Sequence, residues 1–122
     1  MRLLVCGGRG WTDYRMIHKE MLTLRNVPQL ITVVEGGANG ADRLAGVAAR
    51  SIGFNLEEHF ADWAGRGRVA GRERNQLMLD LGIDLLWAFK DGFDHSLRRG
   101  GTEHMVSIAA AANVPWRLFT HD

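Results

Sequence analysis

The stretch LITVVEGGANGAD, residues 30–42, decides the fold class of this chain. Its first six residues are rich in β-branched side chains, which favour a strand. Three glycines interleaved with small polar residues follow, and Asp42 stands where a helix can begin. Apolar residues then recur at helical spacing, which predicts a helix over residues 40–51. A strand, a glycine-rich turn and a helix in this order are typical of a parallel sheet covered by helices.

The same alternation continues through the rest of the chain. Further apolar or β-branched runs predict strands over residues 2–6, 55–59, 83–89 and 116–119, and helices over about 16–24, 75–81 and 102–112. Residues 61–75 are polar, rich in glycine and arginine and without apolar periodicity, which predicts a loop, with Arg66 and Arg68 in solvent. The fold class is therefore α/β: a Rossmann-like three-layer α/β/α sandwich with a mostly parallel sheet of about five strands.

Length, cysteine content and charge limit the classes of protein. A chain of 122 residues predicts a single domain over residues 1–122. The only cysteine, Cys6, is consistent with a reducing, cytoplasmic location, and it is expected to be a buried small hydrophobe. No apolar run approaches the roughly 20 residues of a membrane span. A net charge of +1 makes a nucleic-acid partner unlikely, and the spacing of the histidines predicts no metal site.

Glycines gather where the predicted strands end. One cluster follows the first strand (7, 8 and 10), a second follows the strand at 30–35 (36, 37 and 40), and a third precedes the last helix (100 and 101). Ligands of parallel sheets bind at the carboxyl ends of the strands, and glycine lets backbone amides approach an anion. The glycine spacing fits neither the dinucleotide fingerprint nor a P-loop. The clusters therefore predict a phosphorylated ligand without specifying which one.

Four ordered motifs carry a resemblance to a known family: VCGGRGWTDY (5–14), VVEGGANGADRLA (33–45), FADWAGRGRVAGRERNQLML (60–79) and GGTEHMV (100–106). Together they resemble the YspA-related branch of the SLOG superfamily, which is related to the LOG nucleotide hydrolases and to the Smf/DprA fold. The resemblance implies a Rossmann-like domain, of bacterial or phage origin, that binds a nucleotide or a nucleotide-derived ligand. No further cofactor is expected. Related domains pair through helices, so a homo-oligomer is compatible with the resemblance.

The motifs and the residues beside them give the candidate ligand-binding set. Asp42 is expected to contact ribose hydroxyls, because phosphate would repel it, and the two loop tryptophans are expected either to stack on a base or to fill the rim of the sheet. Gly10 and Asn39 stand where family members often carry a charged residue. The set is Gly7, Gly8, Arg9, Trp11, Gly36, Gly37, Ala38, Asn39, Gly40, Asp42, Asp62, Trp63, Arg74, Asn75, Gly101 and Thr102.

The position of Met105 bears on catalysis. The LOG-type hydrolases that the chain resembles carry a glutamate three residues beyond the threonine of their last motif, and here Met105 stands in that place. A thioether cannot transfer a proton, and Glu103, two residues earlier, points elsewhere on a helix. The chain is therefore expected to bind without turnover, as a sensor or a sequestering protein. A hydrolase or transferase that uses Asp42 or Asp62, and a single-stranded nucleic-acid binder, remain the alternatives.

Overall fold

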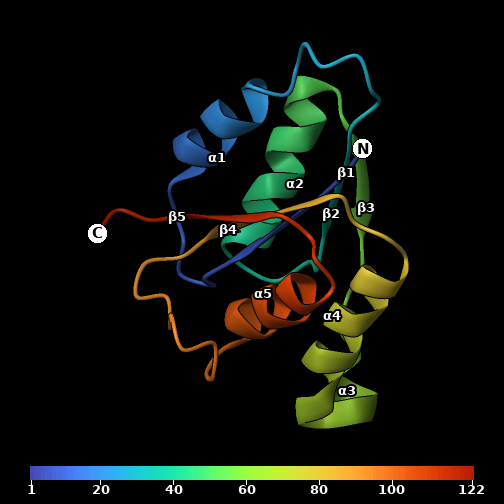
Figure 1. The fold of residues 1–122 in the computed structure, drawn as a ribbon, viewed down its shortest axis with the longest axis vertical. Helices are drawn as coiled ribbons and strands as arrows, with labels where there is room; N and C mark the ends of the chain where they lie inside the picture. The colour runs from blue at the N-terminus through green and yellow to red at the C-terminus, as the bar shows by residue number, and fades with distance from the viewer.

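The computed structural model describes all 122 residues apart from the side chain of Arg68, so the expectation for that side chain lies outside the described residues. Figure 1 shows the elements in space. The strands are β1 (Arg2–Gly7), β2 (Thr32–Glu35), β3 (Asn55–Glu58), β4 (Leu85–Phe89) and β5 (Trp116–Phe119). The helices are α1 (Tyr14–Leu22), α2 (Ala41–Ile52), α3 (Trp63–Arg66), α4 (Ala70–Asp80) and α5 (Gly101–Ala111), with a 3-10 turn, η1 (Gly67–Val69), between α3 and α4.

The five strands form one sheet in the order β3-β2-β1-β4-β5. All four neighbouring pairs are parallel, so every strand ends at the same edge. This confirms the Rossmann-like α/β fold predicted from the alternation of strands and helices. The first strand lies in the middle of the sheet, which explains why its residues form a continuous apolar run: both of its faces are buried.

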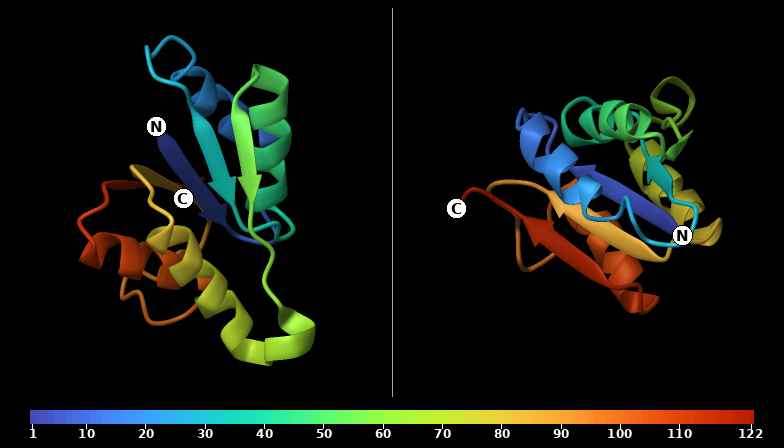
Figure 2. Two further views of the ribbon diagram at one scale, coloured as in Figure 1. Left: turned by 90° about the vertical axis from the view of Figure 1, so that its right-hand side faces the viewer. Right: turned by 90° about the horizontal axis from the view of Figure 1, so that it is seen from above.

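The helices cover the sheet on both faces, as the right-hand view of Figure 2 shows. Alternate residues of β1 separate the two cores. Leu3 and Val5 belong to the core with α1 and α2, whereas Leu4 and Cys6 belong to the core with α4 and α5. The result is the predicted three-layer arrangement, with the carboxyl ends of β1, β2 and β4 left uncovered between the layers. Cys6 is buried, as predicted for a small hydrophobe.

The prediction of a loop over residues 61–75 is wrong. Most of this segment is helical, because it forms α3, η1 and the first half of α4. Asp62 caps α3 by accepting a hydrogen bond from the Gly65 amide (3.0 Å). Residues 61–75 gave no apolar periodicity because α3 buries none of its residues, and this part of α4 buries only Ala70 and Asn75. In the left-hand view of Figure 2 this segment extends beyond the end of the sheet.

The two tryptophans of the strands differ in burial. Trp87 and Trp116 stand in the strands predicted over residues 83–89 and 116–119, which favours a place in the core for both, and Trp87 is indeed buried. Trp116 was expected in the core as well, but its side chain is 37% exposed, so that expectation is wrong. It is the first residue of β5, which is an edge strand, and therefore only part of its ring meets a neighbour. Across the described residues, none of the helices has the length and apolar character required to cross a membrane.

Glu35 ends β2 with a fully buried carboxyl group. Its Oε1 accepts a hydrogen bond from the Gly37 amide, whereas Oε2 is buried without a hydrogen-bond partner. Burial raises the pKa of Glu35 to about 8, and the negative charges of Asp42 and Glu58 act in the same direction against the Gly37 hydrogen bond. The folded protein therefore favours the protonated form of this carboxyl group.

We expect the free energy of unfolding to fall as the pH rises from about 4.5 to 8, because the folded state then retains a proton that the unfolded state has lost. Glu35→Gln, which is neutral throughout, should gain stability relative to the wild type across this window, by up to about 1.4 kcal/mol per pH unit. Urea unfolding at pH 5, 6.5 and 8 measures the difference. The control is Glu73→Gln, which replaces an exposed carboxylate on α4. Its free energy of unfolding should change with pH in the same way as that of the wild type. If the free energy of unfolding of Glu35→Gln changed with pH as it does in the wild type, Glu35 would not be the source of the pH dependence.

Candidate functional site

The first two glycine loops are in direct backbone contact. The Gly8 carbonyl accepts hydrogen bonds from the amides of Trp11 (3.1 Å) and Ala41 (3.2 Å), which joins the β1–α1 loop to the start of α2. Gly40 makes this contact possible. Its φ is +81°, and a Cβ there would lie 2.2 Å from the Gly8 oxygen. The β1–α1 loop therefore occupies the space where a side chain at position 40 would lie.

Other glycines divide into two kinds. A Cβ at Gly7 would meet the Phe89 carbonyl oxygen at 2.1 Å, and a Cβ at Gly36 would meet the Arg74 guanidinium at 2.1 Å. At Gly101 a Cβ would meet nothing within 4 Å, and at Gly8 only atoms at 3.6 Å or beyond. Close packing thus explains the first two glycines, whereas the other two border open space.

That open space is a cavity of about 230 Å³ at the carboxyl edge of the sheet. Its walls come from the ends of β1, β2 and β4, from α4 and from the start of α5. Ten residues of the predicted set line it: Gly7, Gly8, Arg9, Gly36, Ala38, Asp42, Arg74, Asn75, Gly101 and Thr102. Four separate segments of the sequence are therefore brought to one place.

Three further residues also line the cavity, although the sequence did not point to them: Cys6, Met78 and Lys90. Lys90 matters most because it adds a positive charge. It directly follows β4, so the rule that pointed to the other strand ends would also have found it. Cys6 lies at the cavity wall as a thiol whose pKa burial raises, which disfavours the reactive thiolate.

Arg74 and Asn75 connect α4 to the loops around the cavity. The Arg74 Nη1 donates to the Gly36 carbonyl (2.6 Å), and its Nε donates to Asn75 Oδ1 (3.0 Å). The Asn75 Nδ2 donates to the Gly101 carbonyl (3.2 Å) and lies 3.0 Å from His104 Nδ1. Burial, with the nearby charge of Arg72, lowers the pKa of His104, so its neutral ring can accept that hydrogen bond. The pair therefore fixes the β2–α2 loop relative to the start of α5.

Asp42 lies in the first turn of α2 and is almost fully buried. Its Oδ2 accepts hydrogen bonds from the amides of Gly36 (3.2 Å) and Ala38 (3.3 Å). Burial raises the pKa of Asp42 to about 6, against the opposing effects of these amides and of Arg74. The carboxylate thus holds the β2–α2 loop in shape while remaining part of the cavity wall.

Glu103 and Met105 turn away from the cavity. Both carboxylate oxygens of Glu103 accept hydrogen bonds from Lys90 Nζ (2.8 Å each), and Oε2 also accepts one from the Asp94 amide (2.9 Å). Met105 is buried in the core between the sheet and α5. Neither side chain lines the cavity.

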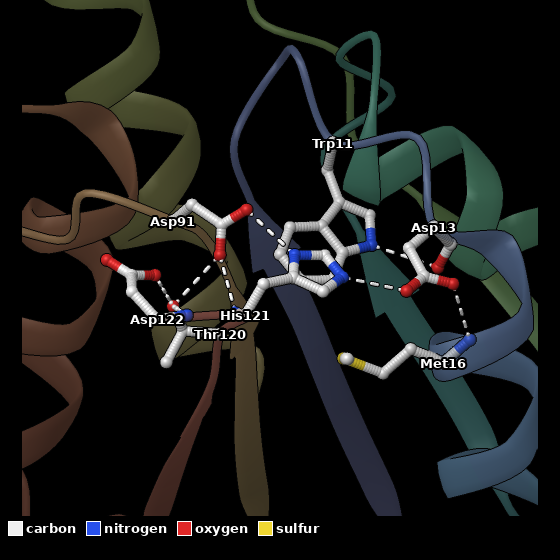
Figure 3. A network of polar contacts seen from close by, with 7 residues as sticks. All are labelled: Trp11, Asp13, Met16, Asp91, Thr120, His121 and Asp122. Atoms are coloured by element: carbon white, nitrogen blue, oxygen red, sulfur yellow. Dashed lines mark hydrogen bonds and ion pairs between the residues drawn. The ribbon is translucent and has the colours of Figure 1, made fainter.

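Trp11 lies at the rim of the sheet, outside the main cavity. It is only 5% exposed, it packs edge-on against Phe89, and its ring stacks on His121 with centroids 4.6 Å apart. Figure 3 shows His121 between Asp13 and Asp91, with each ring nitrogen 2.8 Å from a carboxylate oxygen. These contacts raise the pKa of His121 and lower that of Asp13. Of the two expectations for Trp11, the structure agrees with the one that it fills the rim.

Five other predicted residues also lie off the cavity wall. Gly37 has a φ of +71°, and a Cβ there would meet the Phe60 ring at 2.2 Å. Asn39 is exposed, Gly40 contacts the first loop, and Asp62 caps α3. Trp63 begins α3 with 49% of its surface exposed. The described part of the chain contains no group of three acidic, histidine or cysteine side chains arranged to hold a metal ion.

Comparison with known proteins agrees with this fold. The sequence pattern of the YspA, cpYpsA-related SLOG family matches residues 1–65, which include β1 to β3 and the two interlocked glycine loops. The Gene 61 protein of Mycobacterium phage D29 is 38% identical over 120 residues, and the alignment covers 93% of this chain and 92% of that protein. The resemblance carried by the four motifs is thus confirmed, and the chain belongs to the YspA, cpYpsA-related SLOG family.

Proposed function

We propose that the protein binds a phosphorylated nucleotide or a nucleotide-derived ligand in the cavity, as a sensor or a sequestering protein. One observation carries the proposal: three cationic side chains, Arg9, Arg74 and Lys90, line a single small cavity together with the first turn of α5. Among the described residues, Asp42 is the carboxylate that lines the wall, and Glu103, outside the wall, forms an ion pair with Lys90. Family membership supports a nucleotide-related function.

The start of α5 supplies donors for a phosphate. The amides of Gly101 and Thr102 stand in the first turn, where a helix offers no intrahelical acceptor and its dipole favours an anion. Gly101 leaves the approach open, because no atom lies within 4 Å of the place where its Cβ would be. Arg74 can add a charge-assisted hydrogen bond from its planar guanidinium. In our proposal the phosphate therefore lies between α5 and Arg74.

Asp42 is suited to the sugar of the ligand. Both loop amides use its Oδ2, which leaves Oδ1 able to accept a hydrogen bond from a ribose hydroxyl. A phosphate beside this carboxylate would be repelled, whereas a hydroxyl donates to it. A carboxylate in the same wall as the cations Arg9 and Arg74 therefore favours a ligand that carries both a sugar and a phosphate over bare phosphate.

Binding without turnover is supported by the start of α5. Met105 occupies the place of the hydrolase glutamate and is buried in the core, and Glu103 is neutralised by Lys90. No proton-transferring side chain of α5 in the described residues reaches the cavity wall. A homo-oligomeric state and a cytoplasmic location stay predictions.

Nucleotides should stabilise the fold. A ligand at 100 times its dissociation constant adds about 2.7 kcal/mol to the free energy of unfolding, because it binds the folded state alone. Thermal unfolding with mononucleotides, dinucleotides, cyclic nucleotides and ADP-ribose derivatives measures the shift in Tm. A folded protein that shows no shift with any of these compounds would count against the proposal.

Gly101→Val should weaken ligand binding by about tenfold or more, which corresponds to about 1.4 kcal/mol, because the new side chain fills space between α5 and the phosphate. The φ of Gly101 lies outside the left-handed region, so the substitution should leave the fold intact. Gly10→Val is the matched control: Gly10 also borders open space at an ordinary φ, but it does not line the cavity. Calorimetry with the compound that gives the largest thermal shift compares the variants. Equal affinities for Gly101→Val and the wild type would place the ligand elsewhere.

A second candidate function, nucleotide hydrolysis or transfer, is favoured by one observation. Asp42 lines the cavity, and its pKa is raised to about 6, which is closer to the value of a working general base than that of an ordinary carboxylate. Asp62, the other carboxylate considered from the sequence, caps α3 and does not line the cavity.

The binding proposal predicts that incubation with AMP or with cytokinin-type nucleotides releases no free base above the rate without protein. Chromatography of the reaction mixture measures the released base. Release that is abolished in Asp42→Asn, with that variant shown to be folded, would instead establish the enzyme. Asp62→Asn is the control, because it removes the other candidate carboxylate, which does not line the cavity, while its amide oxygen can still cap α3.

A further inference from the structure

The exposed ring of Trp63 deepens the proposed function by indicating where the base of the ligand lies. We propose that the ligand is a nucleoside 5′-phosphate whose sugar phosphate occupies the cavity and whose base stacks on Trp63, outside the cavity. The base then takes the place that the Arg9 guanidinium holds over the ring in this structure. This inference depends on the proposed function, because it presupposes a phosphate in the cavity.

The size of the cavity requires part of a nucleotide to lie outside it. Pockets that enclose a drug-sized ligand hold roughly 300–1,000 Å³. The cavity here holds about 230 Å³, and the charged side chains in its wall, Arg74, Lys90 and Asp42, suit a phosphate and a sugar better than an aromatic base. A base attached to that sugar must therefore find its contact at the rim.

Trp63 presents an exposed aromatic surface beside Arg9, which lines the cavity. Asp62 caps the turn that carries it, and the ring packs against Gly71 of α4, where a Cβ would lie 3.0 Å from Trp63 Cη2. Despite this support, 49% of the side chain is exposed. A large apolar ring that is held in place and left half uncovered is available to a planar partner.

Arg9 links the ring to the cavity. Its guanidinium carbon lies 5.5 Å from the centroid of the Trp63 ring, and the same side chain lines the cavity wall. A planar cation over a ring marks a face that another planar group can occupy. A base that displaces Arg9 from this face leaves the guanidinium free to pair with the phosphate, so one movement would serve both ends of the ligand.

The other tryptophans do not offer this surface. Trp11 is buried and stacked on His121, and Trp87 is buried in the core. Trp116 is 37% exposed, but it begins β5 and so lies at the amino end of the sheet, away from the cavity. Trp116 is therefore a matched control, as an exposed tryptophan outside the proposed site.

Stacking on Trp63 would recognise the π-face of a base and not its edge, so purine and pyrimidine nucleotides should both bind. Calorimetry with AMP and with ribose 5-phosphate, which lacks a base, separates the two parts of the site. We expect the wild type to bind AMP at least about fivefold more tightly than ribose 5-phosphate, the lower end of what one stacked base contributes. Trp63→Ala should lose this preference and keep its affinity for ribose 5-phosphate. Trp63→Phe should keep part of the preference, and Trp116→Ala all of it.

Three outcomes would overturn the inference, each in a different way. Equal affinity of the wild type for AMP and ribose 5-phosphate would leave the phosphate site standing and remove the base subsite. A preference for AMP that survives in Trp63→Ala would place the base elsewhere. Binding of neither compound would reject the subsite together with a nucleoside monophosphate ligand.

Discussion

The backbone contact between Gly8 and the start of α2 is the constraint on which the site depends. It exists only because Gly40 carries no side chain and adopts a positive φ. Once the Gly8 carbonyl accepts the Ala41 amide, the ends of β1 and β2 are fixed relative to each other. Asp42 then lies where it can hold the amides of the β2–α2 loop, and Arg74 can reach the Gly36 carbonyl. The glycines that look like clearings for a ligand thus serve first to bring two loops together.

Two of the cations that line the cavity are also held in place by contacts within the protein. Arg74 and Lys90 each have a structural partner, the Gly36 carbonyl and Glu103, and each still lines the cavity. Side chains held by such partners would lose little freedom if the proposed phosphate bound there. Arg9 differs, because it is exposed and its described aromatic contact is with Trp63. The site therefore combines two fixed cations with one that can move.

The sequence predicted most of the sheet because buried parallel strands read as continuous apolar runs, and it predicted the site edge because glycines follow those runs. It failed at residues 61–75, since helices that bury almost nothing leave no periodic signal. Lys90 was missed inside a charged loop whose other residues lie away from the cavity. The burial of Trp11 depends on His121, which is 110 residues away in the chain, and no local pattern can reveal such a contact.

The central place of β1 has a consequence for synthesis. Its partner β4 begins at Leu85, so at about 5–20 residues per second the ribosome needs roughly 4–16 s to make that partner after β1. During this time the nascent chain contains β1 to β3 with one edge of the apolar strand β1 unpaired, and such edges promote aggregation. A chain cut after residue 65 would keep that edge permanently open. The first half of the protein, although it carries the family pattern, is thus expected to require the second half in order to fold.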